Sequence, residues 1–152
     1  MTNPGAPDAG LHLDNQLCFL VYRLHRGITD LYRPLLSDLG LTYPQYLVML
    51  VLWEEEPMSV GRIGERLHLD SGTLSPLLKR LEAGGLITRT RDLTDERSVR
   101  GALTPAGDRL RDRARDVPLA VGGCLVETPD DYWALRQTLE HLVARVDEKA
   151  AH

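Results

Sequence analysis

The hydrophobic period of the chain changes from helical to strand-like at residue 86, and few folds accommodate that change. Before it, apolar residues recur every three or four positions in two short stretches, 59–66 and 71–83. This spacing predicts two helices joined by the tight connection Leu67–Asp70. After it, the segments 86–91 and 98–103 are short enough for strands and are joined by a polar loop. The sequence therefore predicts helix, turn, helix and β-hairpin in direct succession.

Further helices are predicted before this succession. An apolar stripe over residues 13–35 has steps of three and four, which predicts one long amphipathic helix. Pro34 lies inside the stripe and should kink the helix or remove one of its hydrogen bonds, and Gly40 should end it. The segment Thr42–Gln45 reads as a capping box, which predicts a second helix that runs to about Trp53.

Two Thr-Pro pairs, at 104–105 and 128–129, predict the starts of two later helices, because threonine caps a helix and proline suits its first turn. Pro118 and the glycine pair 122–123 should interrupt or end the first of them. The predicted fold class is mainly α with a small β-hairpin. We expect a flexible arm over residues 1–12 and a single domain over 13–152, made of a winged helix-turn-helix over 41–103 and long flanking helices over 13–40 and 104–152.

Composition and charge narrow the possible functions. Hydrophobic residues make up 43% and charged residues 26% of the chain, which supports a packed core and excludes wholesale disorder. The longest apolar run, Tyr46–Trp53, is far shorter than the ~20 residues of a membrane span. The first residues lack the basic start and apolar stretch of a signal peptide, so we expect the cytoplasm.

The distribution of charge indicates a nucleic-acid partner. The net charge is −4, but residues 59–103 hold eight basic and six acidic side chains. A basic middle between acidic flanks fits a DNA-facing module on an acidic scaffold. The alternative is a solvated charged face on an ordinary α-helical protein.

The second helix of the helix-turn-helix presents polar side chains opposite its leucines. Short hydroxyls near its start and cations further along suit a helix in a major groove, and its first amides can meet a phosphate. Arg97 in the hairpin loop suits a narrow minor groove, with an adjacent carboxylate to orient it. Pro76 predicts an irregular first turn. The candidate DNA-binding residues are Ser71, Thr73, Ser75, Lys79, Arg80, Arg89, Arg91, Asp95 and Arg97.

The two cysteines, Cys18 and Cys124, are too few for a disulfide scaffold or a four-ligand zinc site. The five histidines show no metal-ligand spacing, so the sequence predicts no metal and no cofactor. Cys18 lies one position off the apolar stripe, in the second turn of the predicted first helix and near the edge of its buried face. Cys124 follows two glycines, where a thiol is free to move. In a reducing compartment such thiols are either inert or redox-active.

Four of the eight aromatic residues are tyrosines between positions 22 and 46. Phenol hydroxyls stabilise a thiolate by donating hydrogen bonds to it. Tyr32 follows Cys18 by 14 residues, which is ~21 Å along a helix. Tyr32 therefore cannot touch Cys18 of its own chain unless the helix breaks, but it can reach Cys18 of a second chain if the two first helices pack in opposite directions. The alternative for Tyr32 and Tyr43 is ordinary packing at an interface.

Several motifs make the chain similar to the MarR family of dimeric bacterial repressors. The loop residues 95–97, followed by Leu103, Thr104 and Gly107, look like the signature of that family. Three blocks resemble a narrower group, the organic hydroperoxide resistance regulators. These blocks are Leu13–Phe19, Leu41–Tyr46 and Leu69–Leu74, and Pro76 also occurs in that pattern.

The resemblance implies a homodimeric repressor that binds a palindromic operator when reduced and releases it when an organic hydroperoxide oxidises Cys18. It implies that Tyr32 and Tyr43 of the partner subunit hydrogen-bond the sensing cysteine, and that Cys124 is the resolving thiol of a two-cysteine member. It further implies that the flanking helices form the dimer. Two alternatives stay open, namely a repressor released by a small aromatic ligand with inert cysteines, and a thiol peroxidase enzyme.

Overall fold

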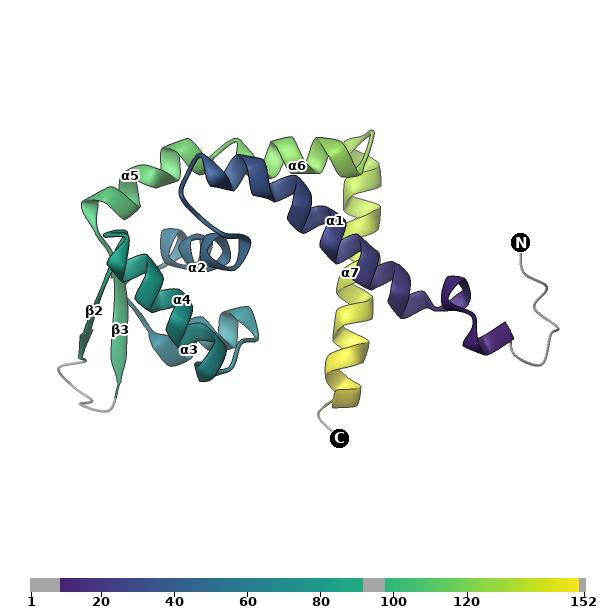
Figure 1. Ribbon diagram of the computed structural model, residues 1–152, viewed down its shortest axis with the longest axis horizontal. Coiled ribbons are helices and arrows are strands. Elements are labelled where there is room, and N and C mark those ends of the chain that lie inside the picture. Colours follow the sequence, from purple (N-terminus) through teal and green to yellow (C-terminus); the bar gives the residue numbers. More distant parts are fainter. Residues whose placement is uncertain (1–8, 92–97, 151–152) are drawn as a thin grey trace. The chain divides into compact units, whose positions relative to one another are not determined.

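The computed structural model describes residues 9–91 and 98–150, and it divides into two compact units, residues 1–115 and 116–152 (Figure 1). In the first unit the helices are α1 (Leu17–Ser37), α2 (Tyr43–Glu54), α3 (Val60–Leu67), α4 (Ser71–Ala83) and α5 (Pro105–Ala114). Its strands are β1 (Met58–Ser59), β2 (Ile87–Arg91) and β3 (Val99–Leu103). The second unit holds α6 (Val117–Leu125) and α7 (Pro129–Ala150). The predicted fold class, mainly α with a small β-hairpin, is confirmed.

Side-chain caps start the helices where the sequence predicts them. Thr42 accepts the Gln45 N–H, and the Gln45 side chain accepts the Thr42 N–H at 2.9 Å, so the capping box of α2 is complete. Ser59 caps α3 by accepting the Arg62 N–H at 3.2 Å. Thr104 caps α5 in the same way. These caps satisfy amides that a helix otherwise leaves unpaired, and they fix where the chain turns.

The start of α1 differs from the prediction. The helix begins at Leu17 and not at Leu13, and two short 3-10 turns, Ala9–Leu11 and Leu13–Asn15, precede it. The Gln16 backbone is extended, and its side-chain amide donates to the carbonyl oxygens of Gly10 and His12. This residue therefore closes the preceding turn and leaves the apolar pattern before it outside the helix. Part of the predicted flexible arm is thus turned, and residues 1–8 lie outside the described residues.

Neither internal proline breaks its helix. The α1 helix continues past Pro34 to Ser37, and α4 is continuous across Pro76, so the irregular first turn predicted for α4 is not found. Pro76 is the sixth residue of α4, where its missing N–H deprives the helix of one hydrogen bond only. Asp70 compensates at the start of α4 by capping the Thr73 N–H.

The predicted two-stranded hairpin is part of a three-stranded sheet. Strands β2 and β3 pair antiparallel, with Arg89 opposite Gly101, and β1 adds a third strand with Met58 opposite Gly101. The sheet order is β1-β3-β2. Two residues are too few to show an alternating pattern, so the sequence did not reveal β1. The buried Met58 side chain anchors it to the core.

The core of the first unit lies between α2 and the helix-turn-helix. Because α2 is apolar around most of its circumference, it suits a central position. The largest fully buried side chains come from α1, α2, α3, α4 and β2, and they are Leu36, Tyr46, Val48, Met49, Leu52, Ile63, Leu74, Leu78, Leu81 and Ile87. Of the four leucines in α4, Leu74, Leu78 and Leu81 are buried, and Leu77 is only half-buried.

A close approach joins the hairpin to α5. A Cβ added at Gly107 would lie 2.0 Å from the Leu86 carbonyl oxygen, so only glycine fits there. The Thr104 hydroxyl donates to the Gly85 carbonyl oxygen at 2.6 Å, and the Thr104 N–H donates to that of Leu86 at 3.0 Å. These contacts fix the exit of β3 against the entrance of β2.

The second unit corrects one boundary. The helix that Thr104 starts ends at Ala114, and a separate helix, α6, begins at Val117 with Pro118 in its first turn. Cys124 therefore lies in α6 and not in the helix that follows the hairpin. The predicted start of the last helix at Thr128 is confirmed, since Thr128 accepts the Asp131 N–H at 3.2 Å. None of the described helices is long and apolar enough to cross a membrane.

Candidate nucleic-acid interface and redox site

The α4 helix separates buried leucines from an open polar face. Leu74, Leu78 and Leu81 are buried, whereas the predicted DNA-facing side chains lie at the surface. Those exposed are Ser71, Thr73, Lys79 and Arg80, and Ser75 is half-buried. The hydroxyls lie in the first half of α4 and the cations in its second half, as expected for a helix that reads a groove and contacts phosphates.

The start of α4 carries a carboxylate, and this limits what its amides can bind. Asp70 accepts the Thr73 N–H at 2.9 Å and the Thr73 hydroxyl at 3.0 Å. These hydrogen bonds hold the pKa of Asp70 below its ordinary value. A phosphate at this helix start therefore competes with the Asp70 carboxylate for the Thr73 amide. Because the Thr73 hydroxyl donates its one hydrogen bond to Asp70, it can only accept a hydrogen bond from another group.

The two arginines of β2 differ in their surroundings. The Arg89 guanidinium contacts the Glu82 carboxylate through Nε at 2.9 Å and Nη2 at 2.6 Å, and the Arg89 backbone N–H donates to the same group at 3.1 Å. The Arg89 hydrogen bonds lower the pKa of Glu82. Arg91, at the end of the strand, is exposed, and no described acidic group pairs with it. The other two hairpin candidates, Asp95 and Arg97, lie outside the described residues.

Cys18 lies in the first turn of α1, one turn earlier than predicted, because the helix begins at Leu17. The sequence placed it at the edge of a buried face, but its side chain is exposed. The apolar stripe around it is also exposed. Leu17 is 66% exposed, and Leu20, Val21 and Leu24 lie open as well. The described residues of the first unit leave this face uncovered, so Cys18 is not a core residue of that unit.

The fold brings Tyr32 and Tyr43 together. Their ring centroids lie 4.7 Å apart, and that of Tyr46 lies 5.8 Å from the Tyr32 ring. Burial raises the pKa of Tyr43 and of Tyr46, and the proximity of Tyr43 raises that of Tyr46 further. These phenols therefore stay protonated at neutral pH and remain donors. Because α1 is unbroken from Leu17 to Ser37, Tyr32 lies ~21 Å along the helix from Cys18 of its own chain.

Tyr46 is a member of this cluster that the sequence did not single out. Its side chain is 1% exposed, and its hydroxyl has no hydrogen-bond partner among the described residues. Its ring also meets that of Trp53 edge-on at 6.3 Å. The available signal was the spacing of Tyr43 and Tyr46, which lie three residues apart and therefore on one side of α2.

Cys124 occupies an open position in the second unit. Its thiol is exposed and donates to the Ala120 carbonyl oxygen, with 3.3 Å between sulfur and oxygen. A Cβ added at Gly122 or Gly123 would meet nothing within 4 Å, so the chain beside the thiol is uncrowded. Cys18 and Cys124 thus belong to different units. Within the described ranges no group of three metal-binding side chains occurs.

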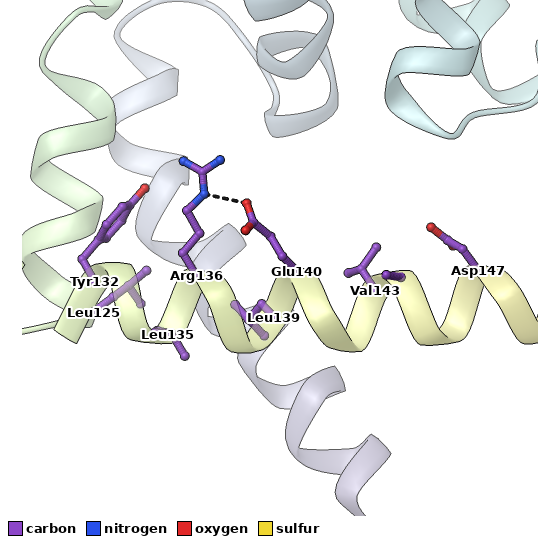
Figure 2. Close-up of a pocket in the computed structure, with 9 residues that line it drawn as sticks. Leu125, Tyr132, Leu135, Arg136, Leu139, Glu140, Val143 and Asp147 are labelled. Carbon is purple, nitrogen blue, oxygen red and sulfur yellow. Dashed lines mark hydrogen bonds and ion pairs between the residues drawn. The ribbon is translucent and has the colours of Figure 1, made fainter. Parts of the chain in front are cut away.

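The second unit also presents an apolar groove with a volume of about 470 Å³ (Figure 2). Leu125, Leu135, Leu139 and Val143 line it, and Arg136 pairs with Glu140 at 2.8 Å along its edge. All 22 residues of α7 are described, and none of them is buried. Like the stripe on α1, this face has no cover within its own unit.

A helix-turn-helix with a β-hairpin and long helices with uncovered apolar faces defines a class of DNA-binding regulators. Residues 41–99 match the description of the MarR family. The organic hydroperoxide resistance transcriptional regulator of Bacillus subtilis is 47% identical over 139 residues, which cover 91% of this chain and 95% of that protein. The chain belongs to the MarR family, and the predicted resemblance is confirmed.

Solved structures of AbfR, a protein of Staphylococcus epidermidis, extend the comparison. Reduced AbfR bound to DNA shares 36% identity with this chain at a TM-score of 0.80, over 94% of this chain and 98% of AbfR. The disulfide form of AbfR shares 38% identity at a TM-score of 0.65, over 91% and 94%.

Proposed function

We propose that the chain is a homodimeric transcriptional repressor that binds a palindromic operator when reduced and senses organic hydroperoxide through Cys18. The observation that carries this proposal is the contact between Tyr32 and Tyr43. The two phenol rings lie 4.7 Å apart between centroids, and Tyr32 is out of reach of Cys18 along the unbroken α1 helix of the same chain. These two phenols can donate hydrogen bonds to the Cys18 thiolate of a second chain.

DNA binding follows from α4 and the hairpin. The exposed hydroxyls and cations of α4 suit a major groove, and the hairpin loop with Asp95 and Arg97 suits the neighbouring minor groove. In a two-fold dimer the two copies of α4 would enter successive major grooves ~34–36 Å apart. The structure of the related reduced AbfR bound to DNA supports DNA binding by the reduced form.

The dimer would form through the uncovered helix faces. Residues 13–40 and 104–152 supply the exposed apolar side chains of α1 and α7, and a monomer rarely leaves faces of this size in water. In an antiparallel arrangement of two α1 helices, each Cys18 approaches the Tyr32–Tyr43 pair of the other chain. Residues 41–103 would remain free to face DNA.

The sensing step is a two-electron oxidation. The Cys18 thiolate attacks the terminal peroxide oxygen, the O–O bond breaks, and sulfenic acid and an alcohol result. Tyr32 and Tyr43 would stabilise the thiolate before the attack. The Cys124 thiol would then displace water from the sulfenic acid to form a disulfide. The disulfide form of the related AbfR supports this second step.

The reaction would consume one peroxide per site and stop, so the protein would act as a regulator and not as an enzyme. It would do so in the cytoplasm. The single reaction per site separates it from a thiol peroxidase, which turns over continuously with a thiol reductant. No cofactor takes part. A repressor released by an aromatic ligand would respond to that ligand with both cysteines absent.

An electrophoretic shift with the operator region of the chain's own gene tests the proposal. Cumene hydroperoxide should release wild-type protein and leave Cys18→Ser bound. Cys124→Ser is the matched control, since it keeps the sensing thiol and should still respond at its first oxidation step. Release of Cys18→Ser by peroxide would contradict the proposal.

A further inference from the structure

We infer that Glu82 and Arg89 form a brace that holds the hairpin at a fixed angle to α4, and that Arg89 supports DNA binding through this brace without touching DNA. The inference rests on the proposed DNA-binding function and changes the role predicted for one of its residues. The sequence grouped Arg89 with the DNA contacts on the strength of its charge. The structure places a carboxylate of α4 against it.

Three hydrogen bonds to one carboxylate make the contact stiff. Two come from the Arg89 guanidinium, at 2.9 and 2.6 Å, and one comes from the Arg89 backbone N–H, at 3.1 Å. A side-chain pair alone lets a long arginine swing about its stem. The backbone bond attaches the main chain of β2 itself to α4, so the strand cannot pivot while the carboxylate holds it.

The brace spans the turn between helix and strand. Glu82 is in the last turn of α4 and Arg89 in the middle of β2, and Gly85 between them has a φ of +70°. The turn is itself hydrogen-bonded, with the Leu86 N–H donating to the Leu81 carbonyl oxygen at 3.0 Å. A glycine turn alone leaves freedom in the angle between α4 and β2. The Glu82–Arg89 pair removes that freedom.

Both partners of this pair are shielded, which distinguishes it from the other described ion pairs. The Arg89 and Glu82 side chains are 25% and 37% exposed. In Glu54–Arg66 only the arginine is comparably shielded, at 35% against 62% for the glutamate, and both partners are more than half exposed in Asp30–Arg33, Arg62–Glu65, Asp112–Arg115 and Arg136–Glu140. Solvent-exposed ion pairs do little to fix the relative positions of the elements they join. Charge-assisted hydrogen bonds that are shielded from water fix those positions more strongly. The Glu82 carboxylate engages Nε and Nη2 of the Arg89 guanidinium and places a negative charge beside it, which disfavours a phosphate at the same group.

The brace gives Glu82→Ala an effect of unusual sign on DNA binding. Removing an acidic side chain from a DNA-facing element normally tightens binding, because the carboxylate repels phosphates. If Glu82 instead positions the hairpin, the same change weakens binding, by about tenfold, because α4 and the hairpin no longer meet DNA in one geometry. Alanine favours helix, so α4 itself keeps its stability.

The experiment measures operator affinity at several salt concentrations for Glu82→Ala, Arg89→Glu and the exchange variant Glu82→Arg/Arg89→Glu. The brace predicts weaker binding for both single variants and an unchanged salt slope for Glu82→Ala. It predicts partial recovery in the exchange variant, because the side-chain ion pair re-forms but an arginine at position 82 cannot accept the backbone N–H of residue 89. Tighter binding by Glu82→Ala, or an exchange variant no better than Arg89→Glu, would overturn it.

Hydrogen exchange of the free protein tests the brace without DNA, so its failure and that of the proposed function stay distinguishable. Glu82→Ala should speed exchange of the Arg89 amide. Arg91→Gln is the matched control, since it removes the same charge two residues further along β2, and it should leave that amide protected. Equal protection of the Arg89 amide in wild type and Glu82→Ala would overturn the brace whether or not the protein binds DNA.

Discussion

The Trp53 indole donates a hydrogen bond to the Gly107 carbonyl oxygen, with a nitrogen–oxygen distance of 3.0 Å in the buried interior. The bond links α2, at the centre of the winged helix-turn-helix, to α5, which follows the hairpin. Gly107 is thereby held on two sides, since the Leu86 carbonyl also lies against it. Any movement of α5 must therefore pass to α2 and to the base of the hairpin.

Gly107→Ala should destabilise the protein by ~1–3 kcal/mol or more, because its Cβ would lie 2.0 Å from the Leu86 carbonyl oxygen and backbone must shift. Thermal and urea unfolding measure the loss. Gly61→Ala is the control within the same unit, since its Cβ meets nothing within 4 Å and α3 gains helix propensity. Equal stability of the two variants would show that the close approach costs nothing.

Stability at low pH should depend on Asp70. Its pKa is lowered in the folded chain, so its contribution is present above the unfolded value of about 3.9 and is lost as pH falls through the lower folded value. Asp70→Asn keeps a capping oxygen and removes the titration. The wild-type advantage over this variant should therefore shrink as pH falls below about 4. Unfolding curves across that range check it, and a constant difference would contradict it.

Tyr43→Phe should bind operator normally and respond more slowly to peroxide. The ring keeps its contact with Tyr32, but the phenol donor is lost. Tyr32→Phe should give the same result. Tyr22→Phe serves as a control outside the pair, because the Tyr22 hydroxyl accepts a hydrogen bond from Arg26 at 3.3 Å. Stopped-flow oxidation measures the rate. Wild-type rates in both Tyr32→Phe and Tyr43→Phe would reduce the tyrosines to packing.

Oxidised protein should run as a covalent dimer on a non-reducing gel, because the resolving bond would join Cys18 of one chain to Cys124 of the other. Cys124→Ser should lose that band, bind operator when reduced, and accumulate overoxidised Cys18 at high peroxide. Mass spectrometry identifies the sulfur species. A monomeric band with both cysteines unlinked after oxidation would rule out Cys124 as the resolving thiol.

Arg97→Ala should weaken operator binding by ~1–3 kcal/mol if the side chain reads a groove, and by less if it meets only phosphate. The salt slope of the affinity separates the two, since loss of one phosphate contact lowers it by about 1. Unchanged affinity in a folded dimer would remove Arg97 from the interface.

Local signals in the sequence were sufficient for most of the fold. The caps at Thr42, Ser59, Thr104 and Thr128 depend on residues within three positions, and each helix starts where its cap predicts. The start of α1 was not predictable in this way, because the apolar pattern continues into the preceding turns. The helix does not start earlier because the Gln16 side-chain amide donates a hydrogen bond to the His12 carbonyl oxygen, which closes the preceding turn.

Contacts between distant positions were less accessible to sequence reasoning. The burial of the α1 stripe was predicted from its period, yet a period says only that a face is apolar and not which chain covers it. The role of Arg89 was predicted from its charge, and its partner Glu82 lies seven residues earlier across a turn. The Tyr46 hydroxyl was missed because burial without a partner is a property of the folded interior.

Because the apolar face of α7 is uncovered within its unit, the stability of this helix should depend on the protein concentration. A helix none of whose 22 residues is buried gains little from its own unit, so most of its stabilisation must come from what binds to it. The thermal midpoint of the reduced protein should then rise with protein concentration. In a cell that makes little of this protein, a larger fraction of the chains would have an unfolded α7. A covalent link between two chains would make the stability of α7 independent of protein concentration.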